Sequence, residues 1–368
     1  MKKFQNIGSC MLLAMGMVGA QTPSPYQVKV LNLTGCGGFV HGTAITALQN
    51  MLTTNATAWN ITVTTVANGA NFTLPYLRGF DVVFFNNNTN LGAVITGAQQ
   101  TAFQTWMSEG GGTEGLHGAM DHGDTWAWYT ANMASGSKFS GHSGWGADPN
   151  AQARRDSVAT AGTIRANKPE YASLWATWGA TPFRWTWSDE WYSFINNPRT
   201  QPGVDMLMTL DENTFNENGT MGDHPATWAL TMPVGTTGKT GRYFYSSRGH
   251  DTPAFADANT RNMIHFGLCW AAGKTFTATT CQTPAVSVYG GKFVKADMRL
   301  SVQGSDLLVN VTGSEKHSVR LFNLSGRLMA QRTGIGAAEY AFANLKGSGV
   351  YTVQIKSGAE TLTRRVTL

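Results

Sequence analysis

The sequence is poor in charged residues, in cysteine and in long apolar runs. Charged residues make up 13% of the 368 residues, and four residues are cysteines. After the first twenty residues no apolar run approaches the roughly 18 residues that a membrane-spanning helix needs, so we expect no transmembrane anchor. Forty-two glycines and 11% aromatic residues are typical of a loop-rich globular protein, and not of a disordered or fibrous one. At this length about two domains are expected.

Two kinds of local motif are also missing. The Gly-rich stretch "TGCGGFVHG" fits neither G-x-x-x-x-G-K-[ST] nor a regular G-x-G-x-x-G, which does not favour nucleotide binding. His-Glu-x-x-His is absent, so a metal site would have to be assembled by the fold from scattered residues.

The first twenty residues have the pattern of a secretory signal peptide. Lys2 and Lys3 precede an apolar run from Ile7 to Val18, and the run ends in small residues at Ala20. We therefore expect a secreted or cell-surface protein that is cleaved after Ala20.

Three cysteines then remain in an oxidising compartment: Cys36, Cys269 and Cys281. They allow at most one bridge, and Cys269 and Cys281 are the closest pair in sequence. The alternative is that all three thiols are buried and reduced, and both possibilities stay open.

Composition divides the chain in two. Residues 21–282 contain 14 Lys and Arg against 17 Asp and Glu, whereas residues 283–368 contain 11 against 5. The near-neutral first part argues against nucleic acid as a partner. All 12 tryptophans precede residue 271. We predict a first domain at 21–273, a Thr-rich linker at 274–288 and a second domain at 289–368.

Strand-like and helix-like segments alternate in the first domain. Runs rich in Val and Phe predict buried strands, and apolar residues at helical spacing predict helices. The strands are expected at 26–34, 80–87, 204–211 and 241–247, and the helices at 41–54, 96–110 and 258–273. This order predicts an α/β fold with a doubly wound parallel sheet and helices on both faces. In such sheets, ligands bind beyond the carboxyl ends of the strands.

The last residues, 289–368, alternate apolar and polar side chains. Turns at Asn323–Gly326 and Ser357–Gly358 predict two hairpins within a small antiparallel β-sandwich. Through "VRLFNLSGRLM", "LKGSGVYTVQIKSG" and Arg364–Arg365, this segment resembles the carboxyl-terminal sorting domain of the Bacteroidetes-type secretion route. The resemblance implies that the secretion machinery is a partner, and that the protein is delivered across the outer membrane, often with removal of the tail.

The stretch "GLHGA" has nearly the shape of a nucleophile elbow, with His117 where that turn usually carries Ser or Cys. Imidazole is a poor acyl nucleophile in this role, but it can act as a general base, proton shuttle or metal ligand. His41, His142 and His250 lie in similar places. Three of the four follow predicted strands, so a parallel sheet would bring them to one edge. The remaining candidates are weaker: His122, His224, His265, which is expected to be packed in the last helix, and His317.

The acidic candidates are Glu114, before the elbow, and the pair Asp189 and Glu190. If this pair lies on a strand, only one of the two can face a site, and we select Glu190, with Tyr192 on the same face. Tryptophans such as Trp187 and Trp191 crowd around this pair. Indole rings hold sugar rings by stacking, but they are equally common core material.

The motifs "GGFVHGTAI", "FDVVFFNNNT", "QQTAFQTWMSEGGGTEGLHGA", "SGSKFSGH", "SDEWYSF", "DHPATWAL" and "GRYFYSSRGHD", in this order, resemble the ThuA-like (trehalose-utilisation) family. The resemblance implies a flavodoxin-like fold of the class I glutamine amidotransferase type and a role in carbohydrate metabolism. It also implies a polar pocket of His41, His117, His142, Glu190 and His250, with Gly249 and Asp251 beside the last. The sequence departs from the family at Asn167-Lys168-Pro169, where a His-Pro step is expected, and a ligand there is in doubt.

These observations predict an exported protein that hydrolyses or isomerises a sugar or keto-sugar by His and Glu acid-base chemistry. It is not expected to be a glutaminase, because no thiol stands at the elbow. The predicted catalytic residues are His117, Glu190 and His250. The predicted substrate-binding residues are His41, His142, Trp187, Trp191, Tyr192 and Asp251. The histidines would orient hydroxyl groups or hold a divalent metal. The alternatives are a non-catalytic surface protein that binds carbohydrate, and buried histidines with a purely structural role.

Overall fold

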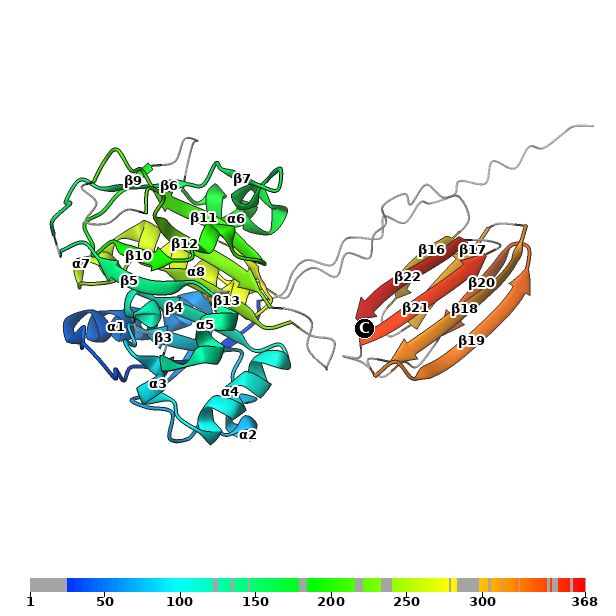
Figure 1. The fold of residues 1–368 in the computed structure, drawn as a ribbon. Coiled ribbons are helices and arrows are strands. Elements are labelled where there is room, and N and C mark those ends of the chain that lie inside the picture. Colours follow the sequence, from blue (N-terminus) through cyan, green and yellow to red (C-terminus); the bar gives the residue numbers. More distant parts are fainter. Residues whose placement is uncertain are drawn as a thin grey trace, which may run out of the picture. The chain divides into compact units, whose positions relative to one another are not determined.

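The computed structural model describes most of residues 25–282 and 298–367. The residues left out within these ranges are 122–124, 134–135, 145, 179–183, 216–220, 233–239, 278, 304–305, 313, 324, 343–344, 346–349 and 358–359. The predicted signal peptide at 1–20 lies outside the described residues. The chain forms two compact units, with the boundary between Pro284 and Ala285 (Figure 1).

The centre of the first unit is a nine-stranded sheet, as far as the described residues go, in the order β2-β1-β3-β4-β13-β12-β11-β6-β9. Its strands are β1 (Val28–Leu33), β2 (Ile61–Val66), β3 (Val82–Asn86), β4 (Gly112–Leu116), β6 (Gln152–Arg155), β9 (Arg184–Thr186), β11 (Val204–Leu210), β12 (Pro225–Thr231) and β13 (Arg242–Ser246). Strands β2, β1, β3, β4 and β13 are parallel, as predicted. Strands β12, β11, β6 and β9 each run antiparallel to their neighbour, so the sheet is mixed and the expectation of a parallel sheet is wrong for this half.

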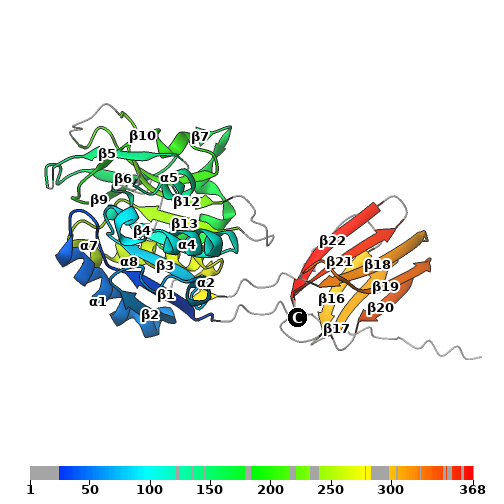
Figure 2. The ribbon, with the colours of Figure 1, turned by 60° about the horizontal axis from the view of Figure 1, so that its bottom comes forward.

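Helices cover both faces of the sheet (Figure 2). The residues of β3 are all buried, and alternate side chains belong to two different cores. Val82 and Phe84 pack in the core that includes α1 (Gly42–Trp59) and α8 (Ala258–Ala271). The intervening Val83 and Phe85 pack in the core that includes α4 (Ala98–Ser108) and α5 (Ala127–Met133). A continuous Val and Phe run is what a strand buried on both faces requires.

Shorter elements fill the connections. The short helices are α2 (Leu74–Leu77), α3 (Leu91–Val94), α6 (Ala172–Ala176) and α7 (Pro253–Ala256). Three two-stranded sheets pair β5 (Lys138–His142) with β10 (Tyr192–Ile195), β7 (Ala159–Thr160) with β8 (Thr163–Ile164), and β14 (Thr275–Phe276) with β15 (Cys281–Gln282). Among the helices of the described ranges, none is long and apolar enough to cross a membrane.

The first unit begins and ends at the same place. Cys269, in α8, and Cys281, in β15, form the disulfide that the sequence left open. Pro25 forms an isolated bridge with Gln282, and the Tyr26 amide donates to the carbonyl of Cys281 at 2.9 Å. The unit therefore includes β14 and β15, which follow α8.

The second unit is built from antiparallel strands, as predicted. Its strands are β16 (Met298–Gln303), β17 (Asp306–Val311), β18 (Lys316–Asn323), β19 (Leu328–Ile335), β20 (Ala338–Phe342), β21 (Val350–Ser357) and β22 (Glu360–Thr367). They form one sheet in the order β16-β17-β20 and another in the order β19-β18-β21-β22. Leu307 and Val309 from the first sheet share a core with Val319 and Val353 from the second, which makes the unit a sandwich.

Candidate functional site

Three histidines follow strands at the carboxyl edge of the parallel half of the sheet. His41 comes after β1, His117 directly after β4 and His250 after β13. The ring centroid of His41 is 4.8 Å from that of His117 and 4.9 Å from that of His250. The centroids of His117 and His250 are 5.3 Å apart. The structure thus gathers residues that are far apart in sequence into one histidine cluster, defined here as His41, His117 and His250.

The loop before α1 holds His41. Its carbonyl accepts the first helical hydrogen bond, from the Ile45 amide, at 2.9 Å, and its side chain is buried. The loop itself is fixed to the turn after β3, because the Thr89 hydroxyl donates to the Phe39 carbonyl at 2.7 Å and the Gly37 amide donates to the Thr89 carbonyl at 2.8 Å.

The predicted elbow is present as a sharp turn from β4 into a 3-10 helix (His117–Met120). His117 has a φ of 41°, a left-handed conformation that costs a non-glycine residue roughly 1–3 kcal/mol. Its small neighbours are required: a Cβ on Gly115 would lie 2.6 Å from the Tyr243 hydroxyl, and one on Gly118 would lie 2.8 Å from the Asn87 carbonyl oxygen. The tight turn therefore depends on these glycines.

The contacts of the His117 ring fix its tautomer. Nδ1 lies 2.8 Å from the carbonyl oxygen of Ser247, which can only accept, so Nδ1 carries a proton. Nε2 is buried, has no hydrogen-bond partner and lies 3.5 Å from Glu190 Oε2. Burial lowers the pKa of His117, but Glu190, Asp189 and the Ser247 carbonyl outweigh burial, and the pKa is raised.

Asp189 and Glu190 both face His117, and the expectation that only one of them could do so is wrong. The segment that joins β9 to β10 is not a strand, so side chains do not alternate there. Asp189 Oδ1 is 3.4 Å from His117 Nδ1, on the opposite side of the ring from Glu190. Asp189 also accepts hydrogen bonds from the backbone amides of Gly249, at 2.9 Å, and His250, at 3.3 Å. These bonds connect the segment to the loop after β13.

Glu190 lies at the centre of the site. Its Oε2 is 3.1 Å from His250 Nδ1 and 4.0 Å from His41 Nε2, in addition to the contact with His117. Its Oε1 is 3.6 Å from Nδ1 of His142, the last residue of β5. Burial raises the pKa of Glu190, but the nearby rings of His117, His250 and His41 outweigh burial and hold the pKa well below its ordinary value. Conversely, burial is the main cause of the lowered pKa of His41.

The predicted aromatic ligands are buried. Trp187 and Trp191 belong to one core and Tyr192 to the other, and the Trp187 ring lies 4.3 Å from Trp185 and 5.0 Å from Trp191. Tyr192 packs under the site, with its ring 4.6 Å from that of His117. These rings pack beneath the site as part of the cores, which is the alternative role that the sequence left open for the tryptophans. Because they are buried, they offer no open face to a sugar.

The surroundings of Asp251, Arg248 and Lys168 differ from those of the histidine cluster. Asp251 is partly buried, and burial and the charge of Asp189 raise its pKa. Arg248 was not selected from the sequence, yet its guanidinium lies 5.0 Å from the ring centroid of Trp185 and 4.9 Å from that of Trp187. Its position directly before "GHD" was the available signal. Lys168, at the departure from the family pattern, pairs with Asp205 at 2.5 Å, away from the histidine cluster.

The weaker candidates lie elsewhere. His224 pairs with Glu212 at 2.9 Å, and His317 contacts the Tyr340 hydroxyl at 2.7 Å in the second unit. His265 is packed between aromatic rings, as predicted, and burial lowers its pKa to about 3. The side chain of Glu114 points at Gly267 in α8, where a Cβ would be 2.5 Å from its Oε1. His122 lies outside the described residues.

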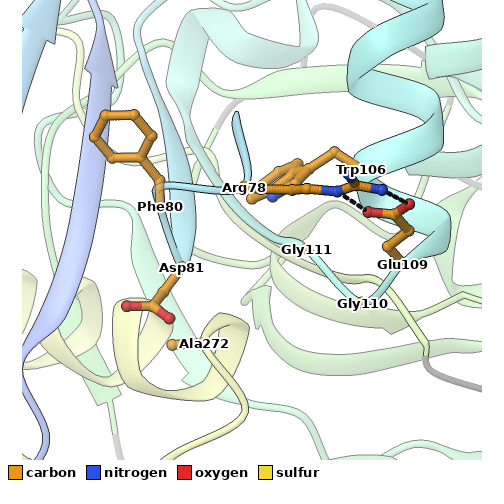
Figure 3. A pocket seen from close by; sticks show the side chains of 8 residues that line it. All are labelled: Arg78, Phe80, Asp81, Trp106, Glu109, Gly110, Gly111 and Ala272. Carbon is orange, nitrogen blue, oxygen red and sulfur yellow. Dashed lines mark hydrogen bonds and ion pairs between the residues drawn. The ribbon is translucent and has the colours of Figure 1, made fainter. Parts of the chain in front are cut away.

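A separate hollow of about 450 Å³ lies at the amino-terminal ends of β3 and β4 (Figure 3). Arg78 and Glu109 form an ion pair across it, with a separation of 2.5 Å. The other lining residues are Phe80, Asp81, Trp106, Gly110, Gly111 and Ala272. No predicted site residue lines this hollow, and it lies at the edge of the sheet opposite the histidine cluster.

A mixed sheet covered by helices, with a polar site at its strand-to-helix turns, defines an α/β protein with a buried histidine and carboxylate centre. The chain belongs to the ThuA family, described as trehalose utilisation, whose family model matches residues 29–271.

One solved structure agrees on the fold. A protein from Bacteroides uniformis described as ThuA-like is 17% identical, with a TM-score of 0.51, over 70% of this chain and 95% of its own, and this likeness shows the fold alone. A protein from Parabacteroides merdae with the same description is also 17% identical, over 70% of this chain and 98% of its own, with a TM-score of 0.47. Comparison with curated proteins finds no match.

Proposed function

We propose that this protein is an enzyme that hydrolyses or isomerises a sugar or keto-sugar at Glu190 and the surrounding histidines. The observation that carries the proposal is that one carboxylate lies within 4.0 Å of a ring nitrogen of four histidines: His41, His117, His142 and His250. Such a centre can exchange protons with hydroxyl and carbonyl groups. The family's association with trehalose utilisation supports carbohydrate as the substrate class.

Exposure divides the work among these residues. The side chain of His117 is 0% exposed, whereas those of Glu190, His250 and His142 are 14%, 15% and 40% exposed. A substrate can therefore touch Glu190, His250 and His142. His117, which was selected from the sequence as catalytic, would act through Glu190 as a positioning residue, with Asp189 on its other side.

Phe39 is the aromatic side chain suited to hold a sugar ring. It is 67% exposed, and its ring centroid is 4.9 Å from that of His41. Its backbone is fixed by the Thr89 hydroxyl, so the ring projects from a tethered loop. Apolar sugar faces stack on aromatic rings, and we assign to Phe39 the role that Trp187 and Trp191 were expected to fill.

Glutaminase chemistry is not part of the proposal. The elbow carries an imidazole, and a thioester intermediate needs a thiolate at that position. Cys36 lies in the loop after β1, where its thiol donates to the Asn87 carbonyl at 3.3 Å.

Substitution of Glu190 and His250 tests the proposal. The substrate is the glycoside or keto-sugar that the wild type turns over in a screen. We expect Glu190→Gln and His250→Asn to lower kcat/KM for it by at least about 100-fold, because each removes a proton-exchanging group. Glu109→Gln is the matched control, since it makes the same carboxylate-to-amide change at the opposite edge of the sheet. Full activity in both site variants would refute the assignment. Binding without turnover in the wild type would favour the carbohydrate-binding alternative.

The proposal includes export. The signal pattern at residues 1–20 and the resemblance of the tail to a sorting domain both support it, with the secretion machinery as a partner.

A further inference from the structure

We propose that His41, His117, His250 and Glu190 bind one divalent transition-metal ion of the zinc type. Each of these residues offers one ligand atom, and the four atoms all lie within 4.8 Å of one another. The inference concerns the site of the proposed function, but metal binding can be measured without any substrate.

The spacing of the donor atoms suits a tetrahedral ion. Zinc lies about 2.0–2.1 Å from its nitrogen and oxygen ligands, so the ligands of a regular tetrahedron are about 3.4 Å apart. Glu190 Oε2 is 3.1 Å from His250 Nδ1, 3.5 Å from His117 Nε2 and 4.0 Å from His41 Nε2. Small side-chain movements would complete the coordination shell.

Unsatisfied nitrogens in the histidine cluster point to a cation. Both ring nitrogens of His41 are buried without a hydrogen-bond partner, and so is Nε2 of His117. Buried polar atoms without partners are costly, and a metal ion would accept the lone pair of Nε2 of His117 and of one ring nitrogen of His41. Neither ring is exposed enough for solvent to serve instead, since the side chains of His41 and His117 are 3% and 0% exposed.

The second ring nitrogen of His117 is arranged as in metal-binding histidines. Nδ1 donates to the Ser247 carbonyl, which leaves the lone pair of the ring on Nε2, 3.5 Å from Glu190 Oε2. Ligating histidines usually donate their second N–H to a carbonyl or carboxylate in this way, and the partner fixes the orientation of the ring. Asp189, 3.4 Å from the same Nδ1, adds negative charge behind this ligand.

The kind of ion and its open side follow from the ligands. Imidazole-rich sets favour zinc and its neighbours, whereas magnesium and calcium prefer oxygen ligands. His142 approaches the other oxygen of Glu190 and is the most exposed histidine of the site, which leaves that side for water or a sugar oxygen. A bound ion would polarise that oxygen.

A second group of metal-ligand types does not compete with this site. His265, Cys269 and Cys281 also lie close together, but the two sulfurs form the disulfide and have no thiolate to offer.

Zinc titration of the full chain tests the inference. In isothermal titration calorimetry, we expect the chelator-stripped protein to bind one Zn²⁺ per chain and to show no binding of Mg²⁺. Loss of a ligand in His41→Ala or Glu190→Gln should weaken binding by more than about 100-fold, whereas Glu109→Gln should bind like the wild type. Absence of zinc uptake, or unchanged affinity in both ligand variants, would overturn the inference.

X-ray absorption of the zinc-loaded wild type reads the ligands without any variant. A shell of three imidazoles with one carboxylate is expected, whereas a shell with sulfur or without imidazole would overturn the assignment. The two proposals also fail separately. Zinc bound at these four residues in a protein that turns over no sugar would leave the metal site standing and count against the enzyme. Turnover of a sugar by a protein that takes up no zinc would support the enzyme and overturn the metal site.

Discussion

Glu114 shows what a single buried charge can cost this fold. It lies within β4, both of its carboxylate oxygens are buried without a hydrogen-bond partner, and burial raises its pKa well above the ordinary value. A carboxyl group whose pKa is higher in the folded than in the unfolded state favours folding only while it is protonated in both states. Its contribution is therefore complete below about pH 4.5, the ordinary value, and is lost as the pH rises through the folded-state pKa.

We predict that Glu114→Gln removes this loss. The free energy of unfolding of the wild type should fall relative to that of the variant between pH 4 and pH 8, because the amide does not ionise. Urea denaturation at several pH values measures the difference. Glu109→Gln, at a partly exposed position, should show no such trend. Parallel pH curves for the wild type and Glu114→Gln would contradict the prediction.

The outcome at Asp189 shows the limit of inference from single residues. The strand rule assigned opposite faces to Asp189 and Glu190, but the tryptophan-rich segment between β9 and β10 is not a strand, and both carboxylates reach His117. Sequence composition there resembles that of a strand. Asp189 is held by hydrogen bonds from the distant residues Gly249 and His250, which no local pattern reveals.

At the level of elements, the disulfide closes the end of the first unit. Cys269 and Cys281 are 12 residues apart and join α8 to β15. In the chain-entropy account, a disulfide that closes a loop of this size stabilises a protein by about 3 kcal/mol. We predict that the double variant Cys269→Ala, Cys281→Ala loses about this amount in guanidinium denaturation. The single variant Cys36→Ala is the control, and equal losses in both proteins would contradict the prediction.

The sequence predicted elements well where their pattern was continuous. The Val and Phe runs of β1 and β3 and the apolar spacing of α1, α4 and α8 were sufficient to predict these strands and helices, but β2, at the edge of the parallel half, was not predicted. Strand direction in the other half was not predictable. Both β11 and β12 are almost wholly buried, so their residues read like those of parallel strands.

The candidate site was predictable for a related reason. Histidines that follow parallel strands meet at one edge, so His41, His117 and His250 could be grouped without knowledge of their contacts. The burial of Trp187 and Trp191 could not be foreseen, because indole rings suit both a sugar platform and a core, and only packing distinguishes the two.

At the scale of the whole molecule, the two units have separate hydrophobic cores among the described residues. The first unit contains the two clusters on either face of the sheet, and the second contains a cluster of its own. We predict that a chain ending at Pro284 keeps the thermal unfolding temperature of the first unit, as measured by calorimetry on the full chain and the shortened one. A fall of more than a few degrees would contradict this independence.

The same shortened chain tests export. If the tail directs secretion, the protein that ends at Pro284 should accumulate inside the cell envelope, whereas the full chain should reach the surface or the medium. Cell fractionation with immunodetection of both proteins measures the distribution. Equal delivery of the two would remove the tail from the proposal.

The pairing of Pro25 with Gln282 has a consequence for any molecule attached to the first unit. Tyr26, next to this pairing, donates to Asp81 at the start of β3, so both ends of the unit leave from the amino-terminal edge of the parallel strands. The histidine cluster lies at the other edge. A fluorescent protein, an affinity handle or a surface tether joined at either end would start from the side of the unit away from Glu190. A circularly permuted version could join the two ends with a short loop and open elsewhere.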